Sequence, residues 1–127
     1  MVAVSLKKKL NSAAARERIR AAAGEDTVHT RAFDVGEGIP WPQRWPGRAL
    51  VNDFSRRWHG HEDELTGDEE AQQQVRAARR SGDVDHAPVY AGEAVGLVTR
   101  ERSATDVVRE MSEDAEKALR QVSELLG

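Results

Sequence analysis

The sequence has no cysteine, few aromatic residues and no long apolar run. Without cysteine, neither a disulfide framework nor a thiolate zinc site can form. The longest apolar runs fall far short of the ~20 residues that span a bilayer. In the first ten residues, MVAVSLKKKL, the lysines follow the apolar residues, whereas a secretory signal begins with its positive charge. We therefore expect a soluble, cytoplasmic protein.

Charge and size narrow the class of protein further. The 127 residues include 19 basic and 22 acidic side chains, a net charge of -3, which argues against a dedicated nucleic-acid binder. The length suits one domain. Only 39% of the residues are hydrophobic and 5% are aromatic, which leaves limited material for a core. We therefore expect a segment that normally packs against another domain or another chain.

The spacing of apolar residues predicts a mostly α-helical chain with one or two short strands. Alternating β-branched residues predict a strand over Thr27–Phe33. The stretch 35–47 holds three prolines and three glycines, which predicts a structured loop. Residues 1–11 form a poorly structured start in this interpretation. Helices are expected over Ser12–Ala23, Arg48–Trp58, Asp68–Arg80 and Ser103–Leu125.

Two tryptophans lie in the predicted loop, in the segment IPWPQRWPGR. Flexible linkers rarely contain tryptophan, so we expect Trp41 and Trp45 to pack on something. A surface for a peptide or a flat ligand is one interpretation. Packing against a neighbouring domain is the other, and composition does not separate the two.

The charged clusters offer weak candidates for chemistry. His59 and His61, with Glu62 and Asp63 beside them, could be read as a metal site, but residues two apart do not share a helix face and no third ligand has useful spacing. A polar helix end is the simpler interpretation. The acidic runs 62–64 and 68–70 are more typical of solvated helix starts than of a cation site. The glycine signatures of phosphate loops, dinucleotide folds and nucleophile elbows are absent.

The stretch YAGEAVGL, Tyr90–Leu97, is the strongest candidate for ligand contact. Gly92 and Gly96 permit close approach to the backbone. A loop that leads into a capped helix is a common place for ligand contacts, and Ser103 with Asp106 predicts such a cap. A tight turn before a helix is the alternative.

Three segments in order resemble a known family. They are GEDTVHTRAFDVGEGIPWPQRWPGRALVNDFSRRWHGHEDEL, then GDVDHAPVYAGEAVGLV, then the amphipathic terminal helix. Together they are similar to the C-terminal third of nitronate monooxygenases, formerly called 2-nitropropane dioxygenases. The shared motifs include G-R-A-L-x-N-x-F and Y-A-G-[QE]-x-x-G-L. The resemblance covers most of the chain, from about Ala13 to Leu126.

The resemblance implies an FMN-dependent enzyme on a (β/α)8 TIM barrel, which oxidises alkyl nitronates with dioxygen to a carbonyl compound and nitrite. A barrel typically needs ≈ 250 residues. Neither the family's catalytic histidine nor its glycine-rich flavin-phosphate loops have a counterpart in this sequence, so no catalytic residue is assigned. We expect the isolated chain to lack oxidase activity, because the fold must orient the flavin ring.

The resemblance also implies which residues lie near the ligands. Gly92, Glu93 and Gly96 would contact the flavin, and Tyr90 would contact the substrate. Many relatives have glutamine at the position of Glu93. Residues 12–80 would form a helical cap, and residues 81–127 a rim loop with the terminal helix. No metal ligand is implied.

The expected partners follow from the same resemblance. The chain would be a truncated or split product whose partner is a separately encoded barrel half, or it would self-associate. The rival hypothesis is a non-enzymatic helical interaction module. Such a module would use exposed faces of the helices Arg48–Trp58 and Ser103–Leu125.

Overall fold

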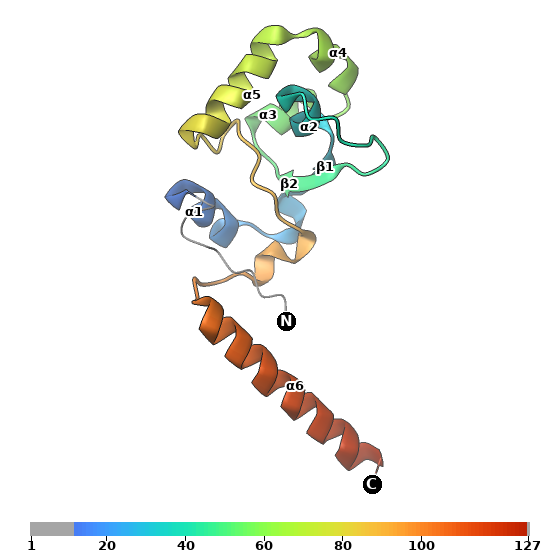
Figure 1. Cartoon of the computed structure of the whole chain (residues 1–127), viewed down its shortest axis with the longest axis vertical. Coiled ribbons are helices and arrows are strands. Elements are labelled where there is room, and N and C mark those ends of the chain that lie inside the picture. The colour runs from blue at the N-terminus through green and yellow to red at the C-terminus, as the bar shows by residue number, and fades with distance from the viewer. Residues whose placement is uncertain (1–11, 127) are drawn as a thin grey trace.

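Helices dominate the fold, and two short strands form one open sheet (Figure 1). A computed structural model describes residues 12–126, so the predicted irregular start, 1–11, lies outside the described residues. The mostly α-helical class with two strands is confirmed, and the two-stranded sheet is open at its edges rather than closed into a barrel. The elements are α1 (Ala13–Ala21), η1 (Gly24–Asp26), β1 (Thr27–Thr30), α2 (Ala32–Glu37), β2 (Gly47–Leu50), α3 (Asp53–Trp58), α4 (Glu62–Gly67), α5 (Glu69–Ser81), η2 (Glu93–Leu97) and α6 (Ala104–Leu126).

The sheet separates two small hydrophobic cores. β1 and β2 pair antiparallel, with Thr27 opposite Leu50 and Thr30 opposite Gly47. Successive side chains of a strand point to opposite faces, so Ala49 and Leu50 enter different cores. The upper core comprises Ala32, Phe33, Ala49, Phe54, Trp58, Leu65, Ala71 and Val75. The lower core comprises Ala15, Ile19, Leu50, Val89, Val95 and Val98.

The predicted helix over Arg48–Trp58 is wrong in its first half. The residues of β2 pair with β1, and the helix begins only at Asp53. Asn52 sets that start, because its side chain accepts a hydrogen bond from the Ser55 amide at 3.0 Å. Leu50 and Val51 therefore do not share a helical stripe with Phe54. Pairing with a distant strand has overridden a local helical spacing.

The predicted strand and loop boundaries also shift. β1 ends at Thr30, whose hydroxyl accepts a hydrogen bond from the Ala32 amide at 3.1 Å. Phe33 then lies in α2, which continues through the first residues of the predicted loop. Gly38 ends this helix in the left-handed region, with φ of 72°, a conformation that glycine adopts without strain.

The other predicted helices are present, and so is the cap predicted from Ser103 and Asp106. Ser12 caps α1 and Ser103 caps α6, each with its hydroxyl accepting an amide hydrogen bond at 3.1 Å. Asp68 caps α5 through the Ala71 amide at 2.9 Å. The acidic run 62–64 forms the first turn of α4, as expected for a helix start. Local capping rules therefore located these helices correctly.

The tryptophan loop packs only in part on the rest of the described chain. Trp41 and Trp45 are 56% and 61% exposed. The Trp41 indole donates a hydrogen bond to the Trp45 carbonyl, and the Arg44 guanidinium lies 5.7 Å from the Trp45 ring centroid. The loop is thus held by its own contacts, and its indoles face solvent.

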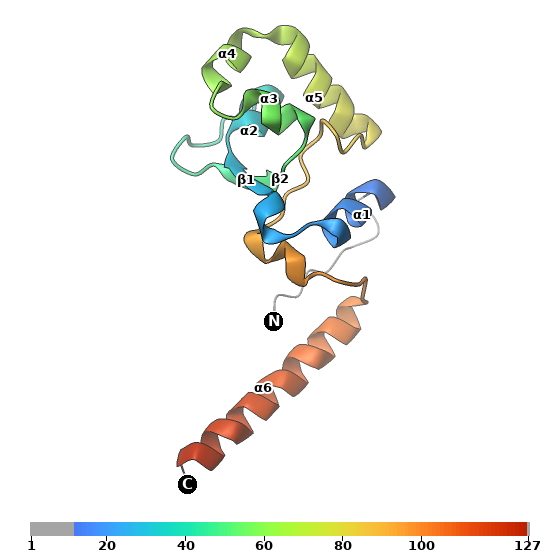
Figure 2. The ribbon, with the colours of Figure 1, turned by 180° about the vertical axis from the view of Figure 1, so that it is seen from behind.

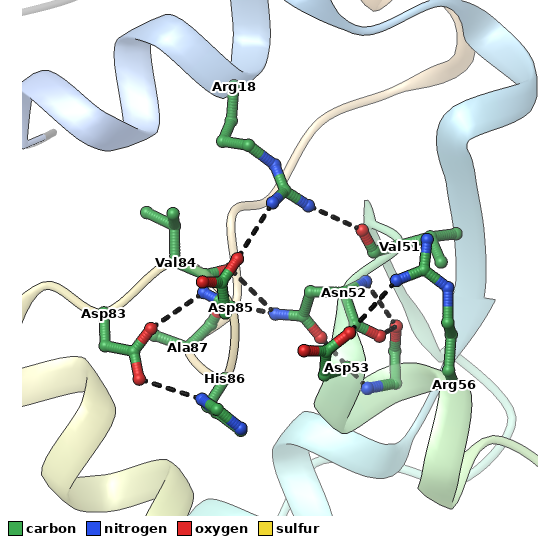
Figure 3. Close-up of polar contacts among 11 residues, drawn as sticks. Arg18, Val51, Asn52, Asp53, Arg56, Asp83, Val84, Asp85, His86 and Ala87 are labelled. Carbon is green, nitrogen blue, oxygen red and sulfur yellow. Dashed lines mark hydrogen bonds and ion pairs between the residues drawn. The ribbon is translucent and has the colours of Figure 1, made fainter.

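A polar network ties the segment 83–87 to α1 and α3 (Figure 3). Arg18 donates to the Asp85 carboxylate at 3.1 Å and to the Val51 carbonyl at 2.9 Å. The Asn52 amide nitrogen donates to the carbonyls of Val84 and Ala87 at 3.2 and 2.9 Å. Asn52 is buried, so it fixes the path along which the chain returns to the sheet.

The terminal helix α6 projects away from the body in both views (Figures 1 and 2). Near its start Val107 is buried. Beyond that point its apolar face is exposed, with Leu119 at 72%. Within residues 12–126, no helix combines the length and apolarity that crossing a bilayer requires. The exposed apolar side chains of α6 are Val108, Met111, Leu119, Val122 and Leu125.

Candidate functional site

The rim loop, Tyr90–Gly96, runs along the outer edge of β2. The Leu50 amide donates to the Val89 carbonyl at 2.8 Å, and the Ala91 amide donates to the Arg48 carbonyl at 3.2 Å. Ala49 and Tyr90 form an isolated antiparallel bridge. Backbone pairing with β2 therefore places residues 89–91, and the rest of the loop belongs to η2.

Tyr90 lies on the face of the upper core. Its ring meets Phe33 edge-on, with centroids 6.5 Å apart, and it covers Gly47, where an added Cβ would lie 3.1 Å from the Tyr90 Cε1. A side chain at position 47 would push the ring away. The tyrosine remains 47% exposed, so it presents part of its ring and its hydroxyl outward.

Charged groups near Tyr90 keep its hydroxyl protonated. Burial raises the pKa of Tyr90, and the carboxylates of Asp34 and Glu37 raise it further, while Arg79 acts in the opposite direction. A neutral phenol can donate a hydrogen bond to an anion. At neutral pH the site therefore offers a donor and not a phenolate.

Glu37 and Arg79 form a bidentate ion pair beside this tyrosine. The Arg79 Nη1 lies 2.7 and 2.8 Å from the two Glu37 carboxylate oxygens, and this contact raises the pKa of Arg79. Burial, followed by the charge of Glu37, raises the pKa of Asp34. Sequence reasoning missed these three residues because it placed Glu37 in a loop and left Asp34 between that loop and the predicted strand. Their spacing of three residues, which places both on one helix face, was the available signal.

Glu93 lies on the other side of the sheet edge from Tyr90. Its carboxylate pairs with Arg48 at 3.1 Å, and Arg48 points away from the face that Gly47 and Ala49 share. Arg48 also donates to the Thr27 hydroxyl at 3.2 Å. The structure therefore separates the predicted flavin contact Glu93 from the predicted substrate contact Tyr90.

The two glycines of the rim loop differ in what they touch. An added Cβ at Gly96 would lie 3.5 Å from the Ala23 Cα, and one at Gly24 would lie 2.6 Å from the Glu93 carbonyl oxygen. These two positions serve the packing of η2 on η1. At Gly92 an added Cβ would meet no described atom within 4 Å, and its φ of -82° suits any residue. Packing within the described chain does not require glycine at position 92.

The rim loop fits the flat part of a flavin and not its phosphate. Tyr90 offers a ring edge and a hydroxyl, and Gly92 leaves its backbone open to close approach. The cation beside the loop, Arg48, is already bound to Glu93 and Thr27. Glu93 itself would repel a phosphate.

Three of the four histidines lie next to carboxylates. His61 Nδ1 lies 3.0 Å from Glu64 and His86 Nδ1 lies 2.8 Å from Asp83, while His59 is 3.9 Å from Glu62. Within the described part of the chain, no three histidine or acidic side chains converge as metal ligands would.

Comparison with known proteins identified two similar sequences. A nitronate monooxygenase of Neurospora crassa is 32% identical over 102 residues, which cover 78% of this chain and 25% of that protein. The nitronate monooxygenase npaC of Metarhizium robertsii is 33% identical over 113 residues, which cover 84% of this chain and 30% of that protein. No established family model matches the chain. The chain thus spans less than a third of the length of these relatives.

Proposed function

This chain is related in sequence to one portion of the nitronate monooxygenases, and from that premise we propose that it supplies ligand contacts to an FMN-dependent site of that type. The observation that carries the proposal is the exposed rim of Tyr90 next to the bare backbone of Gly92. When bound, FMN would supply the electron transfer from an alkyl nitronate to dioxygen. The proposal also assigns the protein to the cytoplasm.

The role assigned to Tyr90 follows from its protonation. An alkyl nitronate is an anion, and a neutral phenol donates a hydrogen bond to its oxygen atoms where a phenolate would repel them. The raised pKa of Tyr90 supports this role. Gly92 contributes space for the planar ring, and the Glu93–Arg48 pair fixes the turn behind it. Turnover needs residues that this chain does not offer, so the chain alone binds without oxidising.

A titration of the purified chain with FMN and with riboflavin, followed by fluorescence anisotropy, tests this proposal. We expect saturable binding of both flavins with dissociation constants within about threefold of each other, because the phosphate finds no free cation at the rim loop. Tyr90→Ala should weaken both by about tenfold, since aromatic stacking on a base contributes ~1–3 kcal/mol. Nitronate-dependent oxygen uptake should be absent.

Trp45→Ala is the matched control, because it removes an exposed aromatic ring outside the rim loop. It should leave both dissociation constants unchanged. Failure of a folded wild-type chain to bind either flavin contradicts the proposal. Equal weakening by both variants would also contradict it, because flavins then adsorb to any exposed ring.

A helical interaction module is the second candidate function, favoured by the exposed apolar face of α6. On the other helix expected to serve such a module, the apolar side chains Phe54 and Trp58 are buried in the upper core, so it offers only polar side chains. On α6 the polar side is occupied by its own ion pairs, such as Arg120 with Glu116. Only the apolar side is left to meet a partner or a second copy.

Sedimentation velocity tests this second candidate. The double change Leu119→Lys with Val122→Lys should reduce any association of the wild-type chain to a monomer, because two charges then lie in the contact face. Glu124→Lys, on the polar side of the same helix, should leave association unchanged. A wild-type chain that sediments as a monomer at all concentrations would rule out self-association.

A further inference from the structure

A pocket lies between α2, the loop 38–46 and α4. Its volume is about 220 Å³, which equals the space of roughly seven water molecules. Drug-sized ligands occupy pockets of about 300–1,000 Å³. The pocket therefore suits a small molecule and is too small for a nucleotide or a flavin.

The pocket carries one negative charge that nothing balances. Its charged lining residues are Arg31, Asp34 and Asp63. Arg31 and Asp63 face each other at 3.9 Å and offset one another. The half-buried side chain of Asp34 has no hydrogen bond or ion pair within the described residues. Its charged neighbour Glu37 is already held by Arg79.

Part of the pocket lining is apolar and aromatic. Trp41 lines the pocket, and its indole is oriented by the hydrogen bond to the Trp45 carbonyl. Ile39 and Val35 complete the apolar lining. The face of an indole ring attracts cations within ≈ 6 Å of its centroid. The pocket lining thus combines the carboxylate of Asp34 with one aromatic and two aliphatic side chains.

We propose that this pocket binds a small primary amine with a flat apolar body. The ammonium group pairs with the Asp34 carboxylate, and the apolar body packs against Trp41 and Ile39. Such a ligand has the opposite charge to an alkyl nitronate, and its anchor Asp34 is also one of the carboxylates that act on Tyr90. Its occupation does not depend on a flavin.

Titration of the full chain with benzylammonium, monitored by NMR of the tryptophan indole protons, tests the proposal. We expect a saturable shift of the Trp41 indole signal. Benzyl alcohol, which has the same shape without the charge, should bind at least tenfold more weakly, and benzoate should not bind. Asp34→Asn and Trp41→Ala should each weaken benzylammonium at least tenfold. Asp53→Asn, an exposed carboxylate on α3, is the matched control and should have no effect.

Asp34→Asn keeps the size of the side chain, and the circular dichroism spectrum confirms that each variant is folded. Equal affinity for benzylammonium and benzyl alcohol would overturn the proposal, because the pocket would then select only an apolar body. Preference for benzoate would overturn it in favour of Arg31 as the anchor. Absence of any indole shift in the folded wild-type chain would overturn it directly.

Discussion

Replacing Phe54 with alanine is expected to lower the free energy of unfolding by about 3–5 kcal/mol. Phe54 is 2% exposed, stacks on Phe33 with centroids 5.6 Å apart and contacts the Trp58 ring at 6.5 Å. Removing the ring leaves a cavity at the centre of the upper core. Because domains are typically stable by only 5–15 kcal/mol, we expect a large loss of cooperative unfolding in a urea titration followed by circular dichroism.

Two further variants test whether this loss of stability comes from the cavity at Phe54 or would follow any substitution of an apolar residue. Phe54→Leu keeps most of the volume and should cost less than about 1.5 kcal/mol. Val122→Ala, on the exposed face of α6, should change stability by no more than ~0.5 kcal/mol. A loss below 1 kcal/mol for Phe54→Ala would mean that the upper core is not packed as described.

Asn52→Ala is expected to have the second largest effect, a loss of about 2–4 kcal/mol. The change removes the N-cap of α3, which contributes ~0.5–2 kcal/mol. It also leaves the carbonyls of Val84 and Ala87 without the donor they have in Figure 3, and an unsatisfied buried polar group costs ≈ 1–3 kcal/mol. Thermal and urea unfolding of the variant measure the combined loss of free energy from the cap and from the two carbonyls.

The control is Asp68→Ala, which removes the cap of α5 and no other hydrogen bond or ion pair that this side chain makes within residues 12–126. It should cost only about 1 kcal/mol. Asn52→Asp distinguishes the two parts of the effect, because it keeps the cap but turns a carboxylate toward two carbonyl oxygens. If Asn52→Asp is as stable as the wild type, the link to the segment 83–87 contributes nothing.

Helices set by local signals were predictable, and elements set by distant pairing were not. Side-chain caps lie at the starts of α1, α5 and α6, and such signals act within three residues of the helix start. The spacing of Leu50, Val51, Phe54 and Trp58 suggested one helix. Leu50 instead belongs to β2, which pairs with β1, and Val51 lies between β2 and α3. The residue pattern of one strand does not identify the distant strand with which it pairs.

The sequence predicted the loop of the candidate site but not the charged residues that surround it. Tyr90 and Gly92 stand out in the sequence, and the structure leaves both accessible. Gly96 serves packing against Ala23, which favours the tight-turn interpretation at that position. The charges that act on Tyr90 come from α2 and α5, and only the folding of these helices onto each other brings them to the ring. The assignments of Gly92, Glu93 and Gly96 to a flavin and of Tyr90 to a substrate stay predictions.

The two cores on either side of the sheet are unequal, so we expect the two parts of the chain to open locally at different free energies. The upper core contains three large aromatic rings, whereas the lower core is built from aliphatic side chains alone. Segments with less buried apolar area open at lower free energy than the whole domain. Contacts of α1 and η2 should therefore break and reform while the upper core stays intact. In those moments Tyr90 remains anchored on Phe33, and Glu93, three residues later, is released.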